Sequence, residues 1–418
     1  MYMNWTVSPS TLEGSVRIPG SKSHTIRALI CSLYADGESL IRDPLVSSDT
    51  LSGKDMAVSL GADISVESGL WRVRSRGVAP SGGTIDVGNS GTSLYFGIAA
   101  AALSCSPVTF SGDEQICRRS AAPLLSALES LGVKTESSNG CTPLTVTGPI
   151  RGGKAEVKAV TSQYLSALLL ACPLAERESV IDVPLLNEKP YVDMTLSWLD
   201  RCGIRYENRG YSRFVIPGGQ RYKTIDCSVP ADFSSAAFFL VAGALTDKGI
   251  LLEGLDYLDT QGDKKVADIL RDMGAEVEIR DSSIFVKGPL LRGGTFDLNE
   301  IPDCLPILAV AGCFAPGETR LVNVAHARIK ETDRIAVMRS ELSKLGADIE
   351  ELSDGLVIRK SVLRGGSVDG HGDHRVIMSM SVAGFNASGN VHIHGCDAVS
   401  VTFPDFMKLA ASLGAQMQ

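Results

Sequence analysis

The stretch Leu342-Ser343-Lys344-Leu345-Gly346-Ala347-Asp348 ends a helix-like run with a glycine and then begins to alternate as a strand does. Five other segments of this 418-residue chain have the same pattern. The six glycines are Gly61, Gly132, Gly203, Gly274, Gly346 and Gly414. Consecutive members are 71, 71, 71, 72 and 68 residues apart. Glycine suits the position after a helix because it adopts a left-handed conformation without strain. The spacing therefore predicts six copies of one supersecondary unit.

A second segment precedes each of these glycines and repeats in step with them. It consists of a turn, a small apolar helix and a strand, and its six openings are Pro19–Arg27, Val87–Ser93, Val160–Ser166, Val229–Ala236, Ile301–Pro306 and Gly370–Arg375. The predicted unit is β-α-β-α-β-β in an α/β fold. Reuse of glycine-ended helices in any α/β protein is the alternative, but it does not explain two patterns in step. Six copies fit one ring or two clusters of three, and the chain length favours two clusters.

The charge balance and the termini exclude several classes of protein. Lys and Arg number 40 and Asp and Glu 48, so the net charge of −8 argues against a general nucleic-acid or membrane-surface binder. No apolar run approaches the roughly 20 residues that a membrane-spanning helix needs. The segment Met1–Trp5 lacks the basic and apolar regions of a signal peptide. The ten cysteines form no CxxC pair, which is typical of core residues in a reducing compartment. We therefore expect a cytoplasmic protein.

Polar groups collect at the openings of the repeats in the first half of the chain. Ser23 and Arg27 are four residues apart and share a helix face. Lys22 stands just ahead of them, at a helix N-terminus, which attracts anions. Thr161–Gln163 offers three neutral groups at another helix start, which suits a phosphate or a polyol. The glycine-rich turn Gly88–Ser93 lets backbone N–H groups approach an oxyanion, although this signal is weak alone.

Charged groups collect at the openings in the last third. Arg328–Arg334 is predicted to start a helix, with Lys330 and Arg334 four residues apart and Glu331 beside them. The alternative for this triplet is a solvated, salt-bridged face. Asp303 opens the fifth repeat, where its alternative role is that of an N-cap.

A shared position at helix starts favours a binding site over these alternatives. For Arg119 the alternative is a surface loop. Two clusters of repeats could direct the cations into one cleft, where they would bind a small, multiply anionic ligand. These cations are Lys22, Arg27, Arg119, Lys330, Arg334 and Arg375.

Histidines late in the chain raise the question of a metal site. His371 and His374 lie close together in sequence, and His392 and His394 alternate along a predicted strand. No Cys or carboxylate completes an evident ligand set around them. We expect neither a metal nor a cofactor.

Eight motifs, in order along nearly the whole chain, resemble the 5-enolpyruvylshikimate-3-phosphate synthase family, the 3-phosphoshikimate 1-carboxyvinyltransferases. They are Pro19–Ser23, Gly88–Thr92, Ser162–Gln163, Lys189–Asp193, Ile301–Asp303, Arg328–Arg334, Asp373–Arg375 and Thr402–Asp405. The resemblance implies two domains, each of three βαβαββ units packed around central helices as an inside-out α/β barrel, with the active site in the interdomain cleft. Residues 1–15 plus 228–418 would form a discontinuous domain and residues 16–227 the second.

The resemblance also implies a reaction and its residues. The 5-hydroxyl of shikimate 3-phosphate would add to C2 of phosphoenolpyruvate, C3 would take a proton, and phosphate would be eliminated. Asp303 would be the base for the hydroxyl, and Glu331 with Lys22 would deliver the proton to C3. Shikimate 3-phosphate would contact Lys22, Ser23, Arg27, Thr161, Ser162, Gln163, Asp303 and Lys330. Phosphoenolpyruvate would contact Lys22, Gly91, Arg119, Gln163, Arg334 and Arg375. The expected protein is a monomer with these small-molecule partners.

Four positions depart from the pattern of many bacterial members. Tyr95 replaces an Arg, Glu188 a Ser, His326 an Asn and Val401 a Lys. The first three change the shikimate-phosphate subsite, and the fourth removes a possible anion contact. None of them touches the implied acid–base residues.

Two alternative functions remain open at this point. One is the enolpyruvyl transferase that acts on UDP-N-acetylglucosamine, which shares the fold. Its reactive Cys lies farther ahead of the loop Arg than Cys117 lies ahead of Arg119, and it has Asn where this chain has Ser23. The other is a non-catalytic anion-binding repeat protein, which would need no Asp303 and Glu331 pair.

Overall fold

The structure is a computed structural model that describes residues 3–418, and it divides into two compact units. Unit 1 combines the N-terminal segment up to Pro19 with Pro230–Gln418, and unit 2 is Gly20–Val229. The chain thus changes unit at Pro19–Gly20 and at Val229–Pro230. No helix within residues 3–418 is long and apolar enough to span a membrane.

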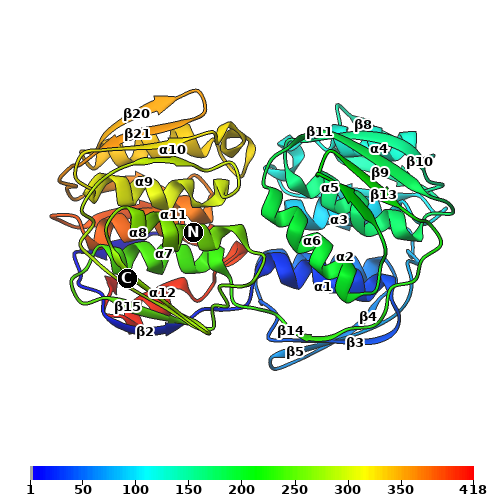
Figure 1. Cartoon of the computed structure of the whole chain (residues 1–418), viewed down its shortest axis with the longest axis horizontal. Helices are drawn as coiled ribbons and strands as arrows, with labels where there is room; N and C mark the ends of the chain where they lie inside the picture. Colours follow the sequence, from blue (N-terminus) through cyan, green and yellow to red (C-terminus); the bar gives the residue numbers. More distant parts are fainter. Residues whose placement is uncertain (1–2) are drawn as a thin grey trace. The chain divides into compact units, whose positions relative to one another are not determined.

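Two of the three sheets in unit 2 are continuous copies of the predicted unit. One copy comprises β6 (Gly83–Asp86), α3 (Gly91–Ala101), β7 (Val108–Ser111), α4 (Ala122–Ser130), β8 (Lys134–Ser138) and β9 (Cys141–Thr147). The next comprises β10 (Gly153–Ala159), α5 (Ser162–Ala171), β11 (Ser179–Leu186), α6 (Lys189–Arg201), β12 (Glu207–Arg209) and β13 (Arg213–Ile216). In both, the first two strands are parallel and the final hairpin is antiparallel, so the βαβαββ unit is confirmed (Figure 1).

The third sheet of unit 2 takes one strand from a distant part of the chain. Its continuous part comprises α1 (Lys22–Tyr34), β3 (Asp36–Arg42), α2 (Ser48–Ser59), β4 (Asp63–Glu67) and β5 (Leu70–Arg76). The missing first strand is β14 (Asp226–Ser228), which lies parallel to β3 with Cys227 opposite Ile41. A strand almost 200 residues later thus completes the first copy.

Unit 1 also holds three sheets of this topology. The first contains α7 (Phe233–Ala244), β15 (Ile250–Glu253), α8 (Lys265–Asp272), β16 (Glu276–Arg280) and β17 (Ser283–Lys287). The second contains β18 (Thr295–Asp297), α9 (Leu305–Phe314), β19 (Glu318–Val322), α10 (Arg334–Lys344), β20 (Asp348–Leu352) and β21 (Gly355–Arg359). The third contains β22 (Gly366–Asp369), α11 (His374–Phe385), β23 (Val391–His394), α12 (Phe406–Ser412) and β24 (Gln416–Met417).

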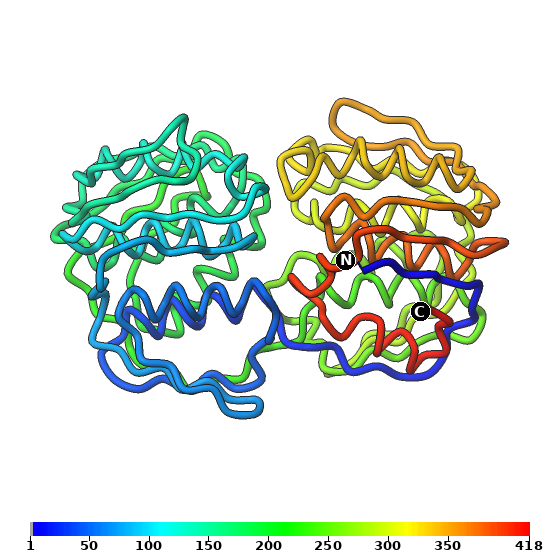
Figure 2. The backbone as a smooth tube through the Cα atoms, turned by 180° about the vertical axis from the view of Figure 1, so that it is seen from behind, coloured from blue at the N-terminus to red at the C-terminus, as the bar shows by residue number. Residues whose placement is uncertain are grey.

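The N-terminal segment completes two of these sheets. Strand β2 (Gly14–Arg17) lies parallel to β15, with Val16 opposite Leu252. Strand β1 (Trp5–Ser8) lies between β23 and β24 and is antiparallel to both. Figure 2 shows this segment, in blue, beside the C-terminal part of the chain, in red.

One helix of each copy lies buried at the centre of its unit. In unit 2 these helices are α1, α3 and α5, and in unit 1 they are α7, α9 and α11. All twelve residues of α7 are buried, as are all twelve of α11. Small polar residues such as Ser379 and Ser381 also lie inside α11, but a side chain in the middle of a helix that is buried all round is shielded from any ligand. The openings of these helices are therefore the places where polar side chains can reach a ligand.

The glycine pattern has the structural origin that the sequence predicts. Each of the six glycines follows the C-cap residue of the second helix in its copy, for example Gly346 after α10 and Leu345. Their φ angles lie between +75° and +112°. This left-handed conformation lets the chain leave the helix and enter the hairpin.

Candidate active site

The N-terminus of α5 offers a row of hydrogen-bond donors in unit 2. Thr161 is the N-cap, and its side-chain oxygen accepts a bond from the backbone N–H of Gln163. The amide of the Gln163 side chain donates to Thr92 Oγ1 at 2.7 Å. The structure thus brings together the three neutral groups that the sequence predicts for this helix start.

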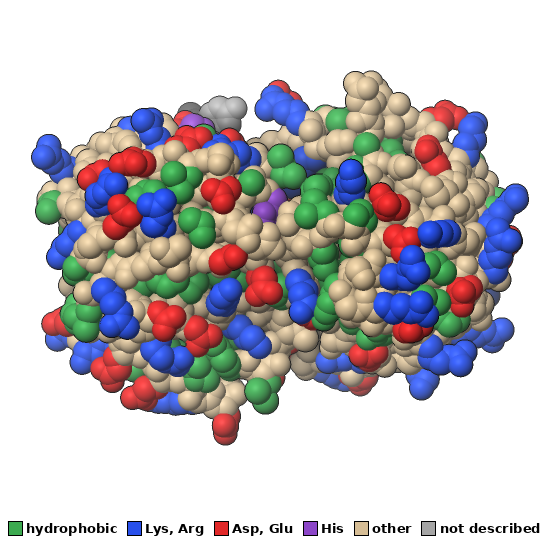
Figure 3. All heavy atoms as spheres, turned by 45° about the horizontal axis from the view of Figure 1, so that its top comes forward, with side chains coloured by type: hydrophobic (Ala, Val, Ile, Leu, Met, Phe, Trp, Pro, Cys, Tyr) green, Lys and Arg blue, Asp and Glu red, His purple; other side chains and the backbone are tan. Residues whose placement is uncertain are grey.

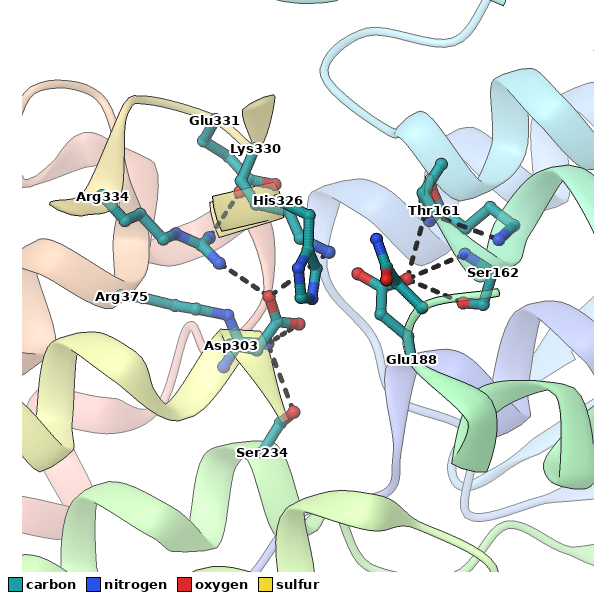
Figure 4. Close-up of polar contacts among 12 residues, drawn as sticks. Thr161, Ser162, Glu188, Ser234, Asp303, His326, Lys330, Glu331, Arg334 and Arg375 are labelled. Carbon is teal, nitrogen blue, oxygen red and sulfur yellow. Dashed lines mark hydrogen bonds and ion pairs between the residues drawn. The ribbon is translucent and has the colours of Figure 1, made fainter. Parts of the chain in front are cut away.

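Glu188 already occupies part of this row. One carboxylate oxygen, Oε2, accepts bonds from the Thr161 hydroxyl at 3.1 Å, the Ser162 backbone N–H at 3.0 Å and the Ser162 hydroxyl at 2.8 Å (Figure 4). Glu188 is 2% exposed and precedes α6 at φ +57°. A left-handed conformation costs a non-glycine residue roughly 1–2 kcal/mol, and these bonds help to offset it.

Arg27 is fixed by neighbouring helices before any ligand binds. Its guanidinium donates to the Thr195 hydroxyl at 2.9 Å and to the backbone oxygens of Tyr191 at 3.0 Å and Ser23 at 3.1 Å. It also lies 5.2 Å from the centre of the Phe96 ring. Burial lowers the pKa of Arg27 to about 10, so the group stays cationic at neutral pH. Three of its five N–H donors are used, which leaves two for an anion.

Lys22, at the first residue of α1, forms an ion pair that the sequence analysis missed. Its Nζ lies 2.8 Å from Oδ2 of Asp49, near the start of α2. The Asp49 side chain is 5% exposed and that of Lys22 is 18% exposed. The pair holds the ammonium group in place at a helix start.

Gly91, Arg119 and Gln163 lie together, as the family resemblance implies. A Cβ atom at Gly91 would stand 3.0 Å from Nη1 of Arg119 and 3.9 Å from Oε1 of Gln163. Arg119 is partly buried and lies in the loop after the 3₁₀ turn Ile116–Arg118. The absence of a side chain at Gly91 leaves the guanidinium close to the start of α3.

Arg334 is the centre of an ion-pair cluster in unit 1. Its Nη1 lies 2.7 Å from Asp303, and its Nη2 donates to Glu331 (Figure 4). Its Nε lies 2.8 Å from Asp373. The side chain is 1% exposed. Although burial lowers it, the three carboxylates raise the pKa of Arg334 well above its usual value. The alternative of a solvated, salt-bridged face is therefore wrong.

The predicted helix start at Arg328–Arg334 is corrected by the structure. Helix α10 begins at Arg334 with Asp333 as its N-cap, and Lys330 and Glu331 lie in the preceding segment. Lys330 and Arg334 are therefore not one turn apart on a helix. Asp333 caps the helix by accepting a bond from Ala336, and this residue type favours a helix start here.

Asp303 receives three cations at the opening of α9. Its Oδ1 lies 2.7 Å from Arg334 and 3.9 Å from Lys330, and its Oδ2 lies 3.1 Å from Arg375. It makes no N-cap bond, because it lies in the short 3₁₀ turn before the helix. Burial raises the pKa of Asp303, but the three cations outweigh burial and hold that pKa far below its usual range. The carboxylate is ionised and can accept a proton.

A second buried acid lies behind this cluster. Arg375 donates to the Ser234 hydroxyl at 3.2 Å, and Ser234 donates to Asp263. Burial, with a smaller contribution from the charge of Asp303, raises the pKa of Asp263 to about 6. No spacing or motif in the sequence pointed to Asp263, because it is brought to α7 and α11 only by the fold.

Besides Glu188, the three other residues that depart from the family pattern have the following contacts and positions. Tyr95 packs edge-on against Tyr164, with ring centres 4.9 Å apart. His326 is buried, with Nε2 3.1 Å from the backbone oxygen of Asn299. Val401 is the last residue of a 3₁₀ turn, Cys396–Val401.

Histidines hold other partners. His371 contacts the buried carboxylate of Glu341 at 2.9 Å, His392 contacts Thr6, and His394 contacts Ser367. Among residues 3–418 no group of three or more His, Cys, Asp or Glu side chains is placed to hold a metal ion.

Comparison with known proteins relates both units to one family. The family described as EPSP synthase (3-phosphoshikimate 1-carboxyvinyltransferase) matches residues 7–409. A 3-phosphoshikimate 1-carboxyvinyltransferase of Acetivibrio thermocellus is 51% identical over 415 residues, which is 98% of each chain. One from Ruminiclostridium cellulolyticum is 48% identical over 99% of each chain.

A solved structure agrees with these relatives. An EPSP synthase from Acinetobacter baumannii superposes with a TM-score of 0.83 at 27% identity and covers 99% of both chains. The family profile spans both units, and it includes every residue of the two clusters described above. This chain therefore belongs to the EPSP synthase family, the 3-phosphoshikimate 1-carboxyvinyltransferases.

Proposed function

We propose that this chain transfers the enolpyruvyl group of phosphoenolpyruvate to the 5-hydroxyl of shikimate 3-phosphate and releases phosphate, as a step of the shikimate pathway. Family membership supports the reaction. The observation that carries the residue assignment is the cluster in which Arg334 joins Asp303 and Glu331, two carboxylates that an addition–elimination reaction can use.

Shikimate 3-phosphate is assigned to residues of both units. Its phosphate would bind Ser23, Arg27 and the α5 start, where Thr161, Ser162 and Gln163 provide donors. Lys22 would add a further positive charge to this subsite. The ring hydroxyls would contact Asp303 and Lys330.

Phosphoenolpyruvate carries a phosphate and a carboxylate, so its ligands should be cations. We assign Lys22, Gly91, Arg119 and Gln163 from unit 2, and Arg334 and Arg375 from unit 1. The close approach of Arg119 to Gly91 supports this assignment, since the missing side chain leaves room for an anion. Guanidinium groups also bind carboxylate and phosphate in a bidentate manner.

The proposed chemistry proceeds through a tetrahedral intermediate. Asp303 takes the proton of the 5-hydroxyl while that oxygen bonds to C2, and Glu331 with Lys22 gives a proton to C3. In the second step C3 loses a proton and the bond from C2 to the phosphate oxygen breaks. The cations stabilise the charge that develops on the phosphate as it leaves. We propose that no metal or other cofactor takes part.

Partners and surroundings follow from the same proposal. On the face of residues 3–418 that Figure 3 shows, basic and acidic side chains are interspersed, which supports small-molecule partners over nucleic acid. We propose a monomeric, cytoplasmic enzyme without a membrane partner. The proposed domains, residues 1–15 plus 228–418 and residues 16–227, have boundaries within four residues of those of the two compact units.

Release of inorganic phosphate tests the proposed acceptor. With phosphoenolpyruvate, the chain should release phosphate when shikimate 3-phosphate is added and not when UDP-N-acetylglucosamine is added. Release with the nucleotide sugar would favour the other enolpyruvyl transferase. Binding of both anions without release would favour a non-catalytic binding protein.

A further inference from the structure

The carboxylate of Glu188 holds the donors that the proposed function assigns to the substrate phosphate. The Thr161 hydroxyl, the Ser162 hydroxyl and the Ser162 backbone N–H all point to its Oε2 atom, at 2.8–3.1 Å (Figure 4). Three donors on one oxygen at a helix N-terminus are the arrangement that a phosphate oxygen would have. In the described structure an anion of the chain itself takes this position.

The two anions cannot use these donors together. A phosphate oxygen that accepted the same three bonds would stand where Oε2 stands, beside a second negative charge in a site that is largely shielded from water. Like charges repel strongly in such surroundings because little solvent screens them. Substrate binding at α5 therefore requires the carboxylate to move or to lose its charge.

We propose that Glu188 is a specificity-determining residue that competes with the substrate phosphate for the start of α5 and is displaced when shikimate 3-phosphate binds. This inference rests on the proposed assignment of that phosphate to Thr161 and Ser162. The carboxylate satisfies these buried donors in the described structure. Any other anion must therefore bind strongly enough to replace the three hydrogen bonds that Glu188 accepts at the start of α5.

The surrounding contacts indicate which part of Glu188 moves. Its backbone oxygen accepts a bond from the Tyr191 N–H at 3.0 Å, inside the first turn of α6. The preceding Asn187 donates from its side chain to the Val160 backbone oxygen at 3.2 Å. The backbone is held on both sides, whereas the side chain has three rotatable bonds. Displacement is therefore a rotation of the side chain.

The cost of displacing Glu188 falls on the substrate and on simple anions alike. Inorganic phosphate can replace the hydrogen bonds of Glu188 only with bonds from its own oxygens to α5 and Arg27. Shikimate 3-phosphate adds the contacts of its ring, which compensate for the bonds that the carboxylate loses. The residue therefore weakens both ligands by a similar factor, and free phosphate, which has no ring contacts, is the one kept from occupying α5. Free phosphate is also a product of the proposed reaction.

Calorimetric titration with Glu188→Ser and Glu188→Gln tests this inference. Both variants should bind shikimate 3-phosphate about 10-fold more tightly than the wild type, because a charged competitor for three hydrogen bonds is gone. Inorganic phosphate, titrated alone, should bind the Glu188→Ser variant at least about 10-fold more tightly as well. The KM for shikimate 3-phosphate should fall while that for phosphoenolpyruvate stays constant. Glu136→Gln, at an exposed residue paired with Lys134, is the control and should change neither titration.

Weaker binding of shikimate 3-phosphate by Glu188→Gln, which keeps the size of the side chain, would overturn the inference and make Glu188 a substrate ligand. Unchanged binding by both variants would overturn it as well. Ser162→Ala should weaken shikimate 3-phosphate binding, and an unchanged affinity there would show that the phosphate binds elsewhere. Turnover of the wild type, measured on the same preparation, tests the proposed function. Calorimetric binding alone tests the displacement of Glu188, so the two failures can be told apart.

Discussion

Arg334 Nη1 lies 2.7 Å from Asp303 Oδ1, so a proposed ligand of phosphoenolpyruvate and the proposed base form one partly buried ion pair. The cation keeps the carboxylate ionised but also makes it a weak base. When an anionic substrate accepts hydrogen bonds from the same guanidinium, the interaction of Arg334 with Asp303 should weaken. The pKa of Asp303 should then rise, which makes the carboxylate a stronger base. Substrate binding and base activation are thus linked through one side chain.

Loss of the Asp303 charge should therefore stop catalysis without unfolding the chain. Asp303→Asn should lower kcat by about 100-fold or more, as expected when a general base is removed. Arg334 keeps Asp373 and Glu331 as partners, so the cluster remains paired. Steady-state kinetics and thermal unfolding check both parts, and Asp281→Asn, at an exposed residue, is the control. Near-wild-type kcat in Asp303→Asn would remove this residue from the mechanism.

Lys22 should have a structural role that is separable from its role in turnover. Lys22→Ala leaves the buried Asp49 carboxylate without its ammonium partner. Because the pair is only partly buried, the loss of stability should be smaller than the roughly 3–5 kcal/mol of a broken, fully buried pair. The double variant Lys22→Ala with Asp49→Asn should recover much of the lost Tm but not the turnover. Recovery of turnover together with Tm would mean that Lys22 acts only through folding.

Two glycines on α3 should respond differently to a methyl group. Gly91→Ala places a Cβ 3.0 Å from Nη1 of Arg119, so the KM for phosphoenolpyruvate should rise while Tm changes little. Gly97→Ala instead places a Cβ 2.6 Å from the sulfur of Met56 and 2.8 Å from Phe110, inside the core. It should lower Tm because overpacking strains the interior. An unchanged KM in Gly91→Ala would argue against an anion site at Arg119.

Asp263 should make stability depend on pH. Its pKa of about 6 in the folded chain lies above its ordinary value of 3.8, so the folded state binds the proton more tightly than the unfolded state does. Stability from this group is present below pH 3.8 and is lost as pH rises through about 6. The loss is on the order of 2–3 kcal/mol.

Asp263→Asn removes this titration. Its Tm relative to the wild type should increase between pH 4.5 and pH 7.5, in scanning fluorimetry at constant ionic strength. Asp247→Asn, at an exposed residue, serves as the control. A Tm difference that does not change with pH would mean that Asp263 is ionised without penalty.

Local patterns in the sequence predicted the repeat well. The six glycines mark helix ends because a left-handed residue is required there. The openings mark the starts of buried helices because turn-forming and polar residues collect there, ahead of an apolar run. The sequence did not predict which distant strands complete each sheet. The pairing of Cys227 with Ile41 and of Val16 with Leu252 depends on contacts between distant segments, which no periodicity reports.

The candidate site was only partly predictable for a similar reason. Asp303, Glu331 and Arg334 lie in motifs that can be recognised, and the structure brings them together. Asp263 and Asp49 meet their partners through tertiary packing, and their sequence neighbourhoods carry no signal. The contact of Glu188 with α5 follows from its left-handed backbone, which glutamate rarely adopts.

Deuterium incorporation into the vinyl group tests the proposed addition–elimination most directly. Wild-type protein, shikimate 3-phosphate and phosphoenolpyruvate are combined in D₂O and followed by ¹H and ³¹P NMR. Proton delivery to C3 by Glu331 predicts deuterium in the methylene group of the product and one phosphate released per product formed. The Glu331→Gln variant should lose both signals by about 100-fold, while Glu276→Gln, at an exposed residue, should keep them. A product whose methylene group carries only protium, or phosphate release without shikimate 3-phosphate, would contradict the mechanism.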